Sequence, residues 1–408
     1  MVETKDRPII VLKYGGSSIA TTDNVKAVAQ QIIRCKASGE DPVVVVSAMG
    51  ESTDHFLTMA YQITEHPTAR ELDMLLSVGE RISIALLAMA INSEGPYEAV
   101  SLTGSQVGII TDTQHTRARI VEIRCGRIHQ VLEQGLIPII AGFQGVSTDK
   151  EITTLGRGGS DTTAVALAAA LKAKQCRIMK DVNGVYTADP RTVEDAHIIN
   201  SLDYDQMLEF SATGSKVLAS DAVALAREHR VEVAVGRTDS GAVGTIITSD
   251  NFTRSGVRGI VAKQGLIAYK LAKQSDLDQV LADFSAEGIP VQGLHSDGIK
   301  PVLLIEVSSQ DMQKSLNIVC SKSTWAERTF RYKRPYSRLS IIGAGLEPGR
   351  ELFGRILSIL EEHHITPRWY CCSPVRVSFC IPEGLTKKTV KLLHRRLISS
   401  TLTSPVDA

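Results

Sequence analysis

The sequence lacks the features that mark several classes of protein. Its seven cysteines form no Cys-x-x-Cys pair and its ten histidines show no metal-binding spacing, so no structural metal site is expected. The 45 basic and 45 acidic residues give a formal net charge of zero, which provides no general attraction to nucleic acid or to an anionic membrane. Residues 1–8 are polar and charged and resemble neither a signal peptide nor a membrane span. We therefore expect a cytoplasmic protein with reduced thiols and without a nucleic-acid or membrane partner.

A serine nucleophile is also missing, because no serine stands in a Gly-x-Ser-x-Gly motif. This absence is informative for reactions at a carboxylate. A carboxylate is already ionised near pH 7, so its phosphorylation needs no general base. Catalysis of such a reaction depends on aligning two anions and on neutralising charge with lysine, backbone N–H groups and a metal ion.

Short apolar runs alternate with stretches of helical spacing over residues 1–250. Buried strands are predicted at residues 9–12, 43–46, 99–102, 137–141, 178–179 and 231–235. Helices are predicted at residues 25–35, 77–91, 120–134, 164–173 and 215–228. This alternation indicates an α/β domain with a largely parallel sheet. In such sheets ligands bind at the carboxyl ends of the strands, where Gly15-Gly16, Ser47-Ala48 and a glycine-rich run at residues 153–164 fall.

The pattern changes after Asp250-Asn251. Strands are predicted at residues 266–271, 302–307, 339–342 and 375–381, and helices at 276–287, 312–319, 350–362 and 387–399. Residues 266–292 and 339–369 form a weak internal repeat, which suggests two small α+β units for ligand sensing or dimerisation, although plain spacers would show the same periodicity. The predicted domains are residues 1–250, 258–334 and 335–402.

The glycine-rich run is the most informative stretch of the chain. Three glycines accompany Arg157 and Asp161 directly before a helical run. Glycine lets the backbone approach a ligand closely, and the free N–H groups of a helix start favour an anion. The guanidinium of Arg157 fits a carboxylate or phosphate, and Asp161 could orient a cation or metal. The run predicts a site for a small, highly charged substrate.

Two further side chains leave alternatives open. Lys13 precedes Gly15-Gly16 at a strand end, which suits either a phosphate site or a lysine before a tight turn. Glu80 lies in a mostly apolar helical stretch, so it needs a partner. That partner is either a substrate ammonium or an internal guanidinium from Arg81 or Arg157.

A polar loop at residues 180–191 contains the turn signals Asn183-Gly184 and Asp189-Pro190. Tyr186 and Arg191 could flank a nucleotide there. Taken alone, the stretch is a polar loop.

Seven motifs occur in an order that resembles the aspartate kinase family of the single-function bacterial type. They are residues 13–18, 45–50, 53–54, 79–80, 141–145, 153–163 and 181–191. The part of the chain after residue 250 resembles the tandem ACT domains of that family. The resemblance implies an amino-acid-kinase three-layer sandwich in which L-aspartate and MgATP meet at the carboxyl edge of a mainly parallel sheet. It also implies phosphorylation of the β-carboxylate of aspartate, with ATP and Mg2+ as cofactors, and a homodimer formed through the ACT region.

The resemblance assigns roles residue by residue. Lys13 and Asp161 are the catalytic residues. The substrate site comprises Ser47, Thr53, Glu80, Arg157, Gly158, Gly159 and Ser160. The nucleotide site comprises Lys13, Tyr14, Gly15, Gly16, Ser47, Lys180, Asp181, Tyr186, Asp189, Arg191 and Lys216. The effector positions are Ile365, Thr366, Ser373 and Pro374.

The chain departs from the family pattern at several positions. Lys180 replaces a usual threonine or serine, Ala219-Ser220 replaces His-Pro, and Ser105 replaces a common tryptophan. The first ACT-like unit lacks the usual Pro-Gly loop, whereas the second keeps Glu347-Pro348-Gly349. We hypothesise that feedback by lysine or threonine is weakened or absent and that the C-terminal region mainly supports dimerisation.

Two alternatives to an active aspartate kinase remain. One is a related amino-acid or carbamate-type kinase that uses another acid, such as glutamate. The other is a catalytically weak homologue that serves as a regulatory or assembly subunit.

Overall fold

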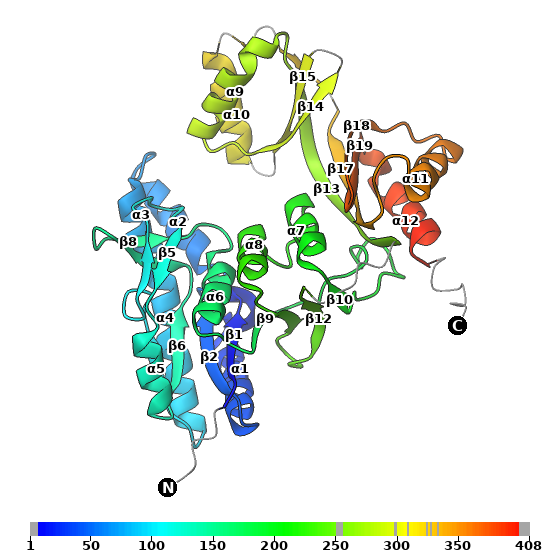
Figure 1. The fold of residues 1–408 in the computed structure, drawn as a ribbon. Coiled ribbons are helices and arrows are strands. Elements are labelled where there is room, and N and C mark those ends of the chain that lie inside the picture. The colour runs from blue at the N-terminus through cyan, green and yellow to red at the C-terminus, as the bar shows by residue number, and fades with distance from the viewer. Residues whose placement is uncertain are drawn as a thin grey trace, which may run out of the picture. The chain divides into compact units, whose positions relative to one another are not determined.

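The computed structural model describes residues 7–249, 256–297, 300–307, 310–323, 325–326, 329–332 and 334–399. The chain forms two compact units (Figure 1). Unit 1 comprises Met1–Val185, Ile198–Ser211 and Lys216–Phe252, and unit 2 comprises Tyr186–His197, Ala212–Ser215 and Thr253–Ala408. The two units are therefore not separated by a single cut in the sequence.

An eight-stranded sheet forms the centre of unit 1, in the order β10-β12-β11-β9-β1-β2-β6-β3. The strands are β1 (Ile9–Tyr14), β2 (Asp41–Val46), β3 (Ala99–Leu102), β6 (Ile137–Ala141), β9 (Gln175–Lys180), β10 (Ser201–Leu202), β11 (Val233–Arg237) and β12 (Val243–Ile247). Every pair from β11 to β3 is parallel, and β11 and β12 are antiparallel. The predicted strands and the mainly parallel sheet are confirmed, because uninterrupted valine and isoleucine runs suit strands that are buried on both faces.

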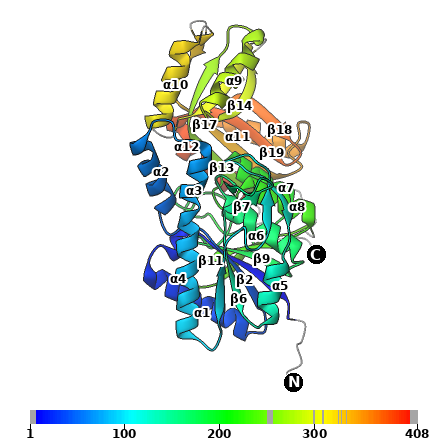
Figure 2. The same ribbon diagram turned by 90° about the vertical axis from the view of Figure 1, so that its left-hand side faces the viewer.

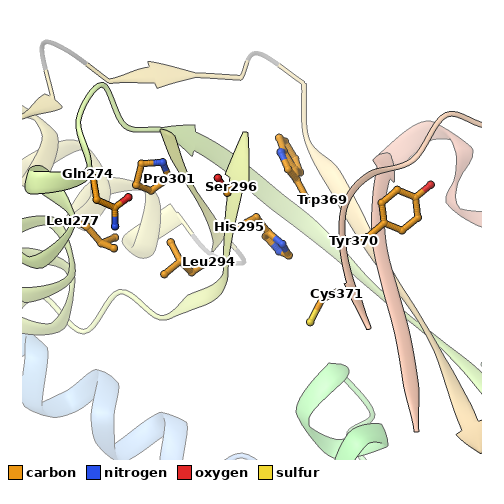
Figure 3. A pocket seen from close by; sticks show the side chains of 9 residues that line it. All are labelled: Gln274, Leu277, Leu294, His295, Ser296, Pro301, Trp369, Tyr370 and Cys371. Atoms are coloured by element: carbon orange, nitrogen blue, oxygen red, sulfur yellow. The ribbon is translucent and has the colours of Figure 1, made fainter. Parts of the chain in front are cut away.

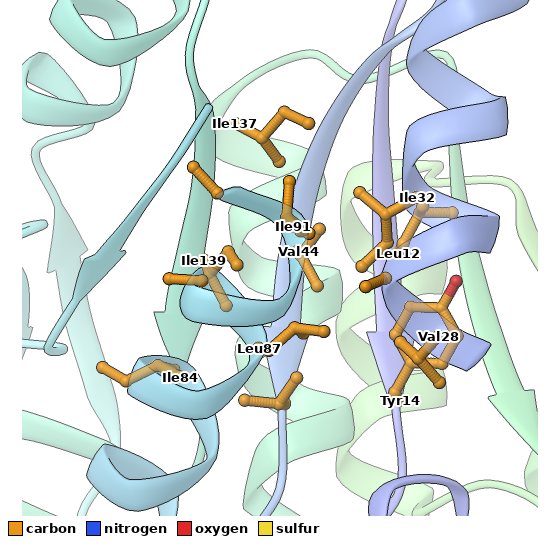
Figure 4. Close-up of a cluster of buried hydrophobic side chains, with 14 of the residues drawn as sticks. Leu12, Tyr14, Val28, Ile32, Val44, Ile84, Leu87, Ile91, Ile137 and Ile139 are labelled. Atoms are coloured by element: carbon orange, nitrogen blue, oxygen red, sulfur yellow. The ribbon is translucent and has the colours of Figure 1, made fainter. Parts of the chain in front are cut away.

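Helices cover both faces of this sheet (Figure 2). Helices α1 (Thr22–Ala37) and α4 (Val78–Glu94) pack on one face, where Leu12, Val44 and Ile139 meet Leu87 in a buried cluster (Figure 4). Helices α6 (Gly159–Ala170) and α8 (Ser220–His229) pack together. Side chains of a strand alternate between faces, so Lys13, the neighbour of Leu12, points to the opposite side and reaches α6.

Three sequence-based boundaries were wrong. The predicted helix at residues 120–134 is β5 (Ile120–Ile123) followed by α5 (Gly126–Glu133), because Cys125 takes a left-handed conformation with φ of 45° between them. Helix α8 begins at Ser220, five residues later than predicted. Helix α6 begins at Gly159, so the end of the glycine-rich run forms its first turn.

A smaller four-stranded sheet was not predicted as a separate feature. Its order is β5-β4-β7-β8, with β4 (Ile109–Thr111), β7 (Gln144–Ser147) and β8 (Ile152–Thr154). Three further helices were also missed: α2 (Ser52–Ile63), α3 (Ala69–Leu76) and α7 (Tyr204–Thr213). Helix α7 begins in the unit 1 segment Ile198–Ser211, and its last two residues belong to unit 2. The short strands carry too few residues for a clear period of two.

Among the described residues, the helical stretch Ala69–Glu94 has the length and the apolar composition of a membrane-spanning helix. Half of its most apolar window is buried. Ile84, Leu87 and Ile91 from this stretch pack in the core cluster of unit 1. The stretch is therefore a core element of the folded unit.

Unit 2 contains a seven-stranded sheet with the path β14-β15-β13-β17-β19-β18, and β16 pairs with β13 beside it. Its strands are β13 (Gly256–Lys270), β14 (Val291–Asp297), β15 (Lys300–Glu306), β16 (Phe330–Arg331), β17 (Tyr336–Ala344), β18 (Arg368–Ser373) and β19 (Arg376–Pro382). Its helices are α9 (Leu277–Ala286), α10 (Gln310–Lys322), α11 (Glu351–Glu362) and α12 (Thr386–Leu397). The strands and helices predicted for this region are found, but β13 begins ten residues before the predicted start at residue 266. Strands β14, β16 and β18 were not predicted.

Strand β13 serves two hydrophobic cores. Most of its length pairs with β17, and its end pairs with β15. Ile260 packs with Leu339 in one buried cluster, whereas Tyr269 packs with Leu303 in another. The two α+β units thus share one long strand.

The segment Tyr186–His197 joins unit 2 through specific contacts. Ala188 and Val193 are buried in the cluster that contains Ile260. The backbone N–H of Ile260 donates to the carbonyl of Thr187 at 2.8 Å, and the Thr187 hydroxyl lies 2.9 Å from Nε2 of His394.

Candidate active site

The carboxyl ends of β9, β1, β2 and β6 meet at one edge of the unit 1 sheet, because these neighbouring strands are parallel. The loops that follow them are joined by backbone hydrogen bonds. The N–H of Ser47 donates to the carbonyl of Tyr14 at 3.1 Å, and that of Gly142 donates to the carbonyl of Val46 at 3.0 Å. The predicted position of the site at this edge is thus supported by its geometry.

Glycines allow the loops at this edge to lie very close together. A Cβ atom on Gly16 would lie 2.7 Å from the carbonyl oxygen of Ala48, and one on Gly79 would lie 2.6 Å from Cβ of Ala48. Gly158 precedes α6 with φ of 82°, a left-handed conformation that favours glycine. The first turn of α6 can therefore approach the ends of the strands.

A cluster of three charged side chains, the buried Lys13 and Asp161 and the partly buried Lys180, lies at this edge. Nζ of Lys13 lies 2.6 Å from Oδ1 of Asp161, and Nζ of Lys180 lies 3.1 Å from Oδ2. Lys13 and Asp161 are only 5% and 4% exposed. Burial alone would raise the pKa of Asp161, but the two ammonium groups hold it below its ordinary value. Two cations around one carboxylate leave an excess of one positive charge, which suits a phosphate group.

Glu80 stands in the first turn of α4 and is 2% exposed. Its Oε1 accepts the backbone N–H of Ala48 at 3.1 Å, whereas Oε2 has no hydrogen-bond donor among the described residues. Burial raises the pKa of Glu80 to about 7, although the backbone donors and Lys13 act in the opposite direction. No ion pair joins Glu80 to Arg81 or Arg157 in the described part of the chain. The internal guanidinium partner that the sequence left open is thus not found.

The other predicted substrate residues surround the start of α6 and α2. Ser160 is buried beside Asp161, and Ser47 and Thr53 are partly buried. Arg157 is exposed and forms no ion pair with the described residues. Its guanidinium is therefore available to an anion from solution.

The predicted nucleotide residues are divided between unit 1 and unit 2. Gly15, Gly16, Ser47 and Lys180 lie at the sheet edge, but the phenol of Tyr14 is buried in the core cluster of unit 1, where burial raises its pKa. Asp181 and Lys216 are exposed in unit 1.

Tyr186, Asp189 and Arg191 belong to unit 2. Nη2 of Arg191 lies 2.8 Å from Oδ2 of Asp189, and this hydrogen-bonded guanidinium lowers the pKa of Asp189. These two side chains therefore pair with each other.

A cavity of about 530 Å³ in unit 2 was not foreseen from the sequence (Figure 3). Its lining residues are Gln274, Leu277, Leu294, His295, Ser296, Pro301, Trp369, Tyr370 and Cys371. The rings of His295 and Trp369 are stacked with centroids 6.4 Å apart. The predicted effector positions do not line this cavity: Ile365 is buried in the core, and Thr366, Ser373 and Pro374 lie at other places around β18.

Known proteins resemble the chain over most of its length. A model of the amino acid kinase family matches residues 8–237. The chain is 38% identical to an aspartokinase of Geobacillus stearothermophilus over 395 residues, which are 95% of this chain and 96% of that protein. It is also 38% identical to an aspartokinase of Corynebacterium efficiens over 416 residues, with the same shares of the two chains.

Solved structures agree with the fold. The structure of E. coli aspartokinase III in complex with lysine and aspartate matches with a TM-score of 0.78 and 23% identity, over 96% of this chain and 99% of that chain. The aspartate kinase of Synechocystis matches with a TM-score of 0.55 and 31% identity, over 98% of this chain and 70% of that chain. The predicted fold class, a mainly parallel amino-acid-kinase sandwich followed by α+β units of the ACT type, is confirmed.

Proposed function

Because the chain belongs to the aspartokinases of the amino acid kinase family, we propose how its own residues phosphorylate L-aspartate. The γ-phosphoryl group of ATP is transferred to the β-carboxylate of L-aspartate. The products are 4-phospho-L-aspartate and ADP, and the reaction is the first step towards lysine, threonine and methionine.

The buried pair of Lys13 and Asp161 is the observation that carries the proposed mechanism. Nζ of Lys13, held 2.6 Å from the Asp161 carboxylate, neutralises negative charge on the phosphoryl group as it moves between two oxygen atoms. The β-carboxylate of the substrate attacks phosphorus directly, and the bond to the leaving oxygen of ADP breaks. No proton moves, since the nucleophile is already ionised.

Glu80 and Arg157 recognise the amino acid. Oε2 of Glu80, which has no hydrogen-bond donor in the part of the chain that the structure describes, accepts the substrate ammonium. The exposed guanidinium of Arg157 binds a substrate carboxylate. A buried carboxylate without a partner is costly, which explains why a cationic ligand is favoured there. Ser47, Thr53 and the first turn of α6 complete the substrate site.

The nucleotide binds beside Gly15, Gly16 and Lys180, with Asp181, Tyr186, Asp189, Arg191 and Lys216 assigned to the same function. Among the described residues, no group of three or more His, Cys, Asp or Glu side chains could hold a metal ion. Both oxygens of Asp161 are also engaged by ammonium groups. A Mg2+ ion would be carried by the phosphates of ATP, and it would supply positive charge to the phosphoryl group beside Lys13.

The proposed assembly is a homodimer formed through the ACT-like units, within the predicted bounds 258–334 and 335–402. A cytoplasmic location agrees with the free state of all seven cysteines, which include the adjacent pair Cys371 and Cys372.

Hydroxylamine trapping tests the reaction. The purified protein is incubated with MgATP, hydroxylamine and either L-aspartate or L-glutamate, and the hydroxamate is measured; a Lys13→Ala variant serves as the control. We expect a hydroxamate with aspartate that is lost in the variant. Product with glutamate instead would identify a related amino-acid kinase, and no product with either acid would favour a regulatory or assembly subunit.

A further inference from the structure

A fully buried carboxylate outside the charged cluster connects two parts of the proposed substrate site. Asp73 in α3 has no exposed surface. Its carboxylate accepts the backbone N–H of Thr116 at 3.0 and 3.1 Å and lies 2.6 Å from Nδ1 of His115. The hydroxyl of Thr154 donates to Oδ1. These partners are 42, 43 and 81 residues away in the sequence, so Asp73 joins segments that are distant along the chain.

On one side, Asp73 holds the turn that carries Arg157. Thr154 ends β8, three positions before Arg157, and its carbonyl accepts the N–H of Ala118 at 2.9 Å. Gly156, with φ of 77°, lies so close to the carbonyl oxygen of Thr116 that an added Cβ atom would be 3.1 Å from it. The turn at residues 154–157 therefore rests on the loop that Asp73 fixes.

On the other side, Asp73 is continuous with the helix that carries Glu80. The carbonyl of Asp73 accepts the N–H of Ser77 at 3.1 Å, and Ser77 immediately precedes α4. The carbonyl of Ser77 in turn accepts a hydrogen bond from Nε2 of Gln144 at 2.8 Å. The start of α4 is thus tied both to Asp73 and to β7.

We propose that Asp73, together with His115 and Thr154, is a positioning residue that sets the distance between Glu80 and Arg157. This inference rests on the proposed function, in which these two side chains bind the ammonium and a carboxylate of one small amino acid. Because both groups are attached to the same short molecule, a displacement of either side chain weakens binding sharply. A charged group suits this connecting role, since its hydrogen bonds are short and strong when donors surround it.

The test compares substrate affinities in an Asp73→Asn variant and in a matched control. Asparagine keeps the shape and the acceptor at Oδ1, but the amide nitrogen that takes the place of Oδ2 cannot accept a bond from Nδ1 of His115. We expect KM for L-aspartate to rise about tenfold or more, while KM for MgATP stays within about twofold. Arg70→Gln on the same helix α3 is the control, because the Arg70 side chain is half exposed and its ion pairs within the described part of the chain are with the solvent-accessible carboxylates of Glu71 and Glu151. It should change neither value.

Two milder variants keep the test decisive if Asp73→Asn does not fold. His115→Phe and Thr154→Val each remove one side-chain donor to Asp73, and each should raise KM for L-aspartate about two- to fivefold. A lowered melting temperature with unchanged KM for L-aspartate would show that Asp73 only stabilises the fold. Equal rises of KM for both substrates would also overturn the proposal.

Failure of the proposed function is recognised separately. If the wild-type protein forms no hydroxamate, calorimetric titration with L-aspartate replaces kinetics. Weaker binding to Asp73→Asn than to Arg70→Gln would then still support the positioning role, and equal binding would refute it.

Discussion

Two buried carboxylates at the sheet edge have opposite surroundings at the residue scale. Asp161 lies between two ammonium groups, and its pKa is held below the ordinary range even though burial acts in the other direction. Glu80 accepts one backbone N–H and keeps one oxygen without a donor among the described residues. Both oxygens of Asp161 are paired with ammonium groups before substrate binds, whereas Oε2 of Glu80 is left for a cationic group of the substrate. This difference assigns Asp161 to organising Lys13 and Glu80 to binding substrate.

Replacing Lys13 tests the electrostatic part of the mechanism. In Lys13→Ala, kcat measured by ADP release should fall by about two to three orders of magnitude, because the charge nearest to Asp161 is lost from a buried site. Circular dichroism checks that the variant is folded. A kcat within threefold of the wild-type value would exclude Lys13 from the chemistry.

Glu80 gives a prediction about pH and stability. Its pKa of about 7 exceeds the ordinary value of 4.5, so the folded protein holds an extra proton between these values. The contribution of Glu80 to the free energy of unfolding is therefore full below pH 4.5 and is lost as pH rises through 7. We expect the difference in unfolding free energy between wild type and Glu80→Gln to fall by up to about 3 kcal/mol from pH 5 to 8.

Urea unfolding of both proteins at several pH values measures this difference. Saturating L-aspartate should reduce the pH dependence of the wild type, because the substrate ammonium then pairs with the carboxylate. A difference that is constant with pH would contradict the raised pKa.

The sequence revealed these residues to different degrees. Lys13, Glu80 and Asp161 stand in recognisable motifs: Lys13 is near a strand end, Glu80 follows Gly79, and Asp161 lies two positions after Gly159. The sequence therefore singled them out as candidate site residues before the fold was known. Asp73 was missed, because its partners His115 and Thr154 meet it only after folding. No local pattern in the chain indicates such a meeting.

At the scale of elements, uninterrupted apolar runs made β1 and β2 easy to predict, since both are buried on both faces. The prediction of a single helix at residues 120–134 was wrong, because the apolar residues of β5 and α5 together have a spacing that also fits one helix. The left-handed Cys125 that separates them has no signal in the sequence, as cysteine rarely takes that conformation.

Gly142, which directly follows β6, should be essential to the close approach of Ser160 in the first turn of α6. A Cβ atom there would lie 2.8 Å from Cβ of Ser160 and 3.0 Å from the carbonyl oxygen of Val46. Gly142→Ala should therefore destabilise the protein by about 1–3 kcal/mol and lower kcat, because α6 carries Asp161.

Gly126→Ala is the matched control for this substitution. An added Cβ at Gly126 meets nothing within 4 Å, and the residue begins α5. It should be neutral or stabilising by about 0.5–1 kcal/mol. Thermal unfolding and kcat of the two variants measure the contrast, and similar effects of both would show that close packing at Gly142 is unimportant.

At the scale of the whole molecule, the lining of the cavity in unit 2 leads to a prediction about regulation by amino acids. None of the nine described residues that line the cavity of about 530 Å³ is Asp, Glu, Lys or Arg. A free amino acid carries both charges and would lose its hydration there without ionic partners. We expect lysine and threonine at millimolar concentration, alone or together, to leave the steady-state rate unchanged. Inhibition by ADP in the same assay provides the positive control, and clear inhibition by either amino acid would contradict the expectation.

The segment Tyr186–His197 belongs to unit 2, although it lies within the catalytic part of the sequence, and this has a practical consequence for building chimeras. Ala188 and Val193 lie in the core of unit 2, and Thr187 contacts Ile260 and His394. A catalytic fragment cut before β13 would therefore expose an apolar patch and leave polar groups unsatisfied. An exchange of regulatory modules between homologous kinases should transfer residues 186–197 together with the C-terminal region, so that the graft brings its own complementary surface.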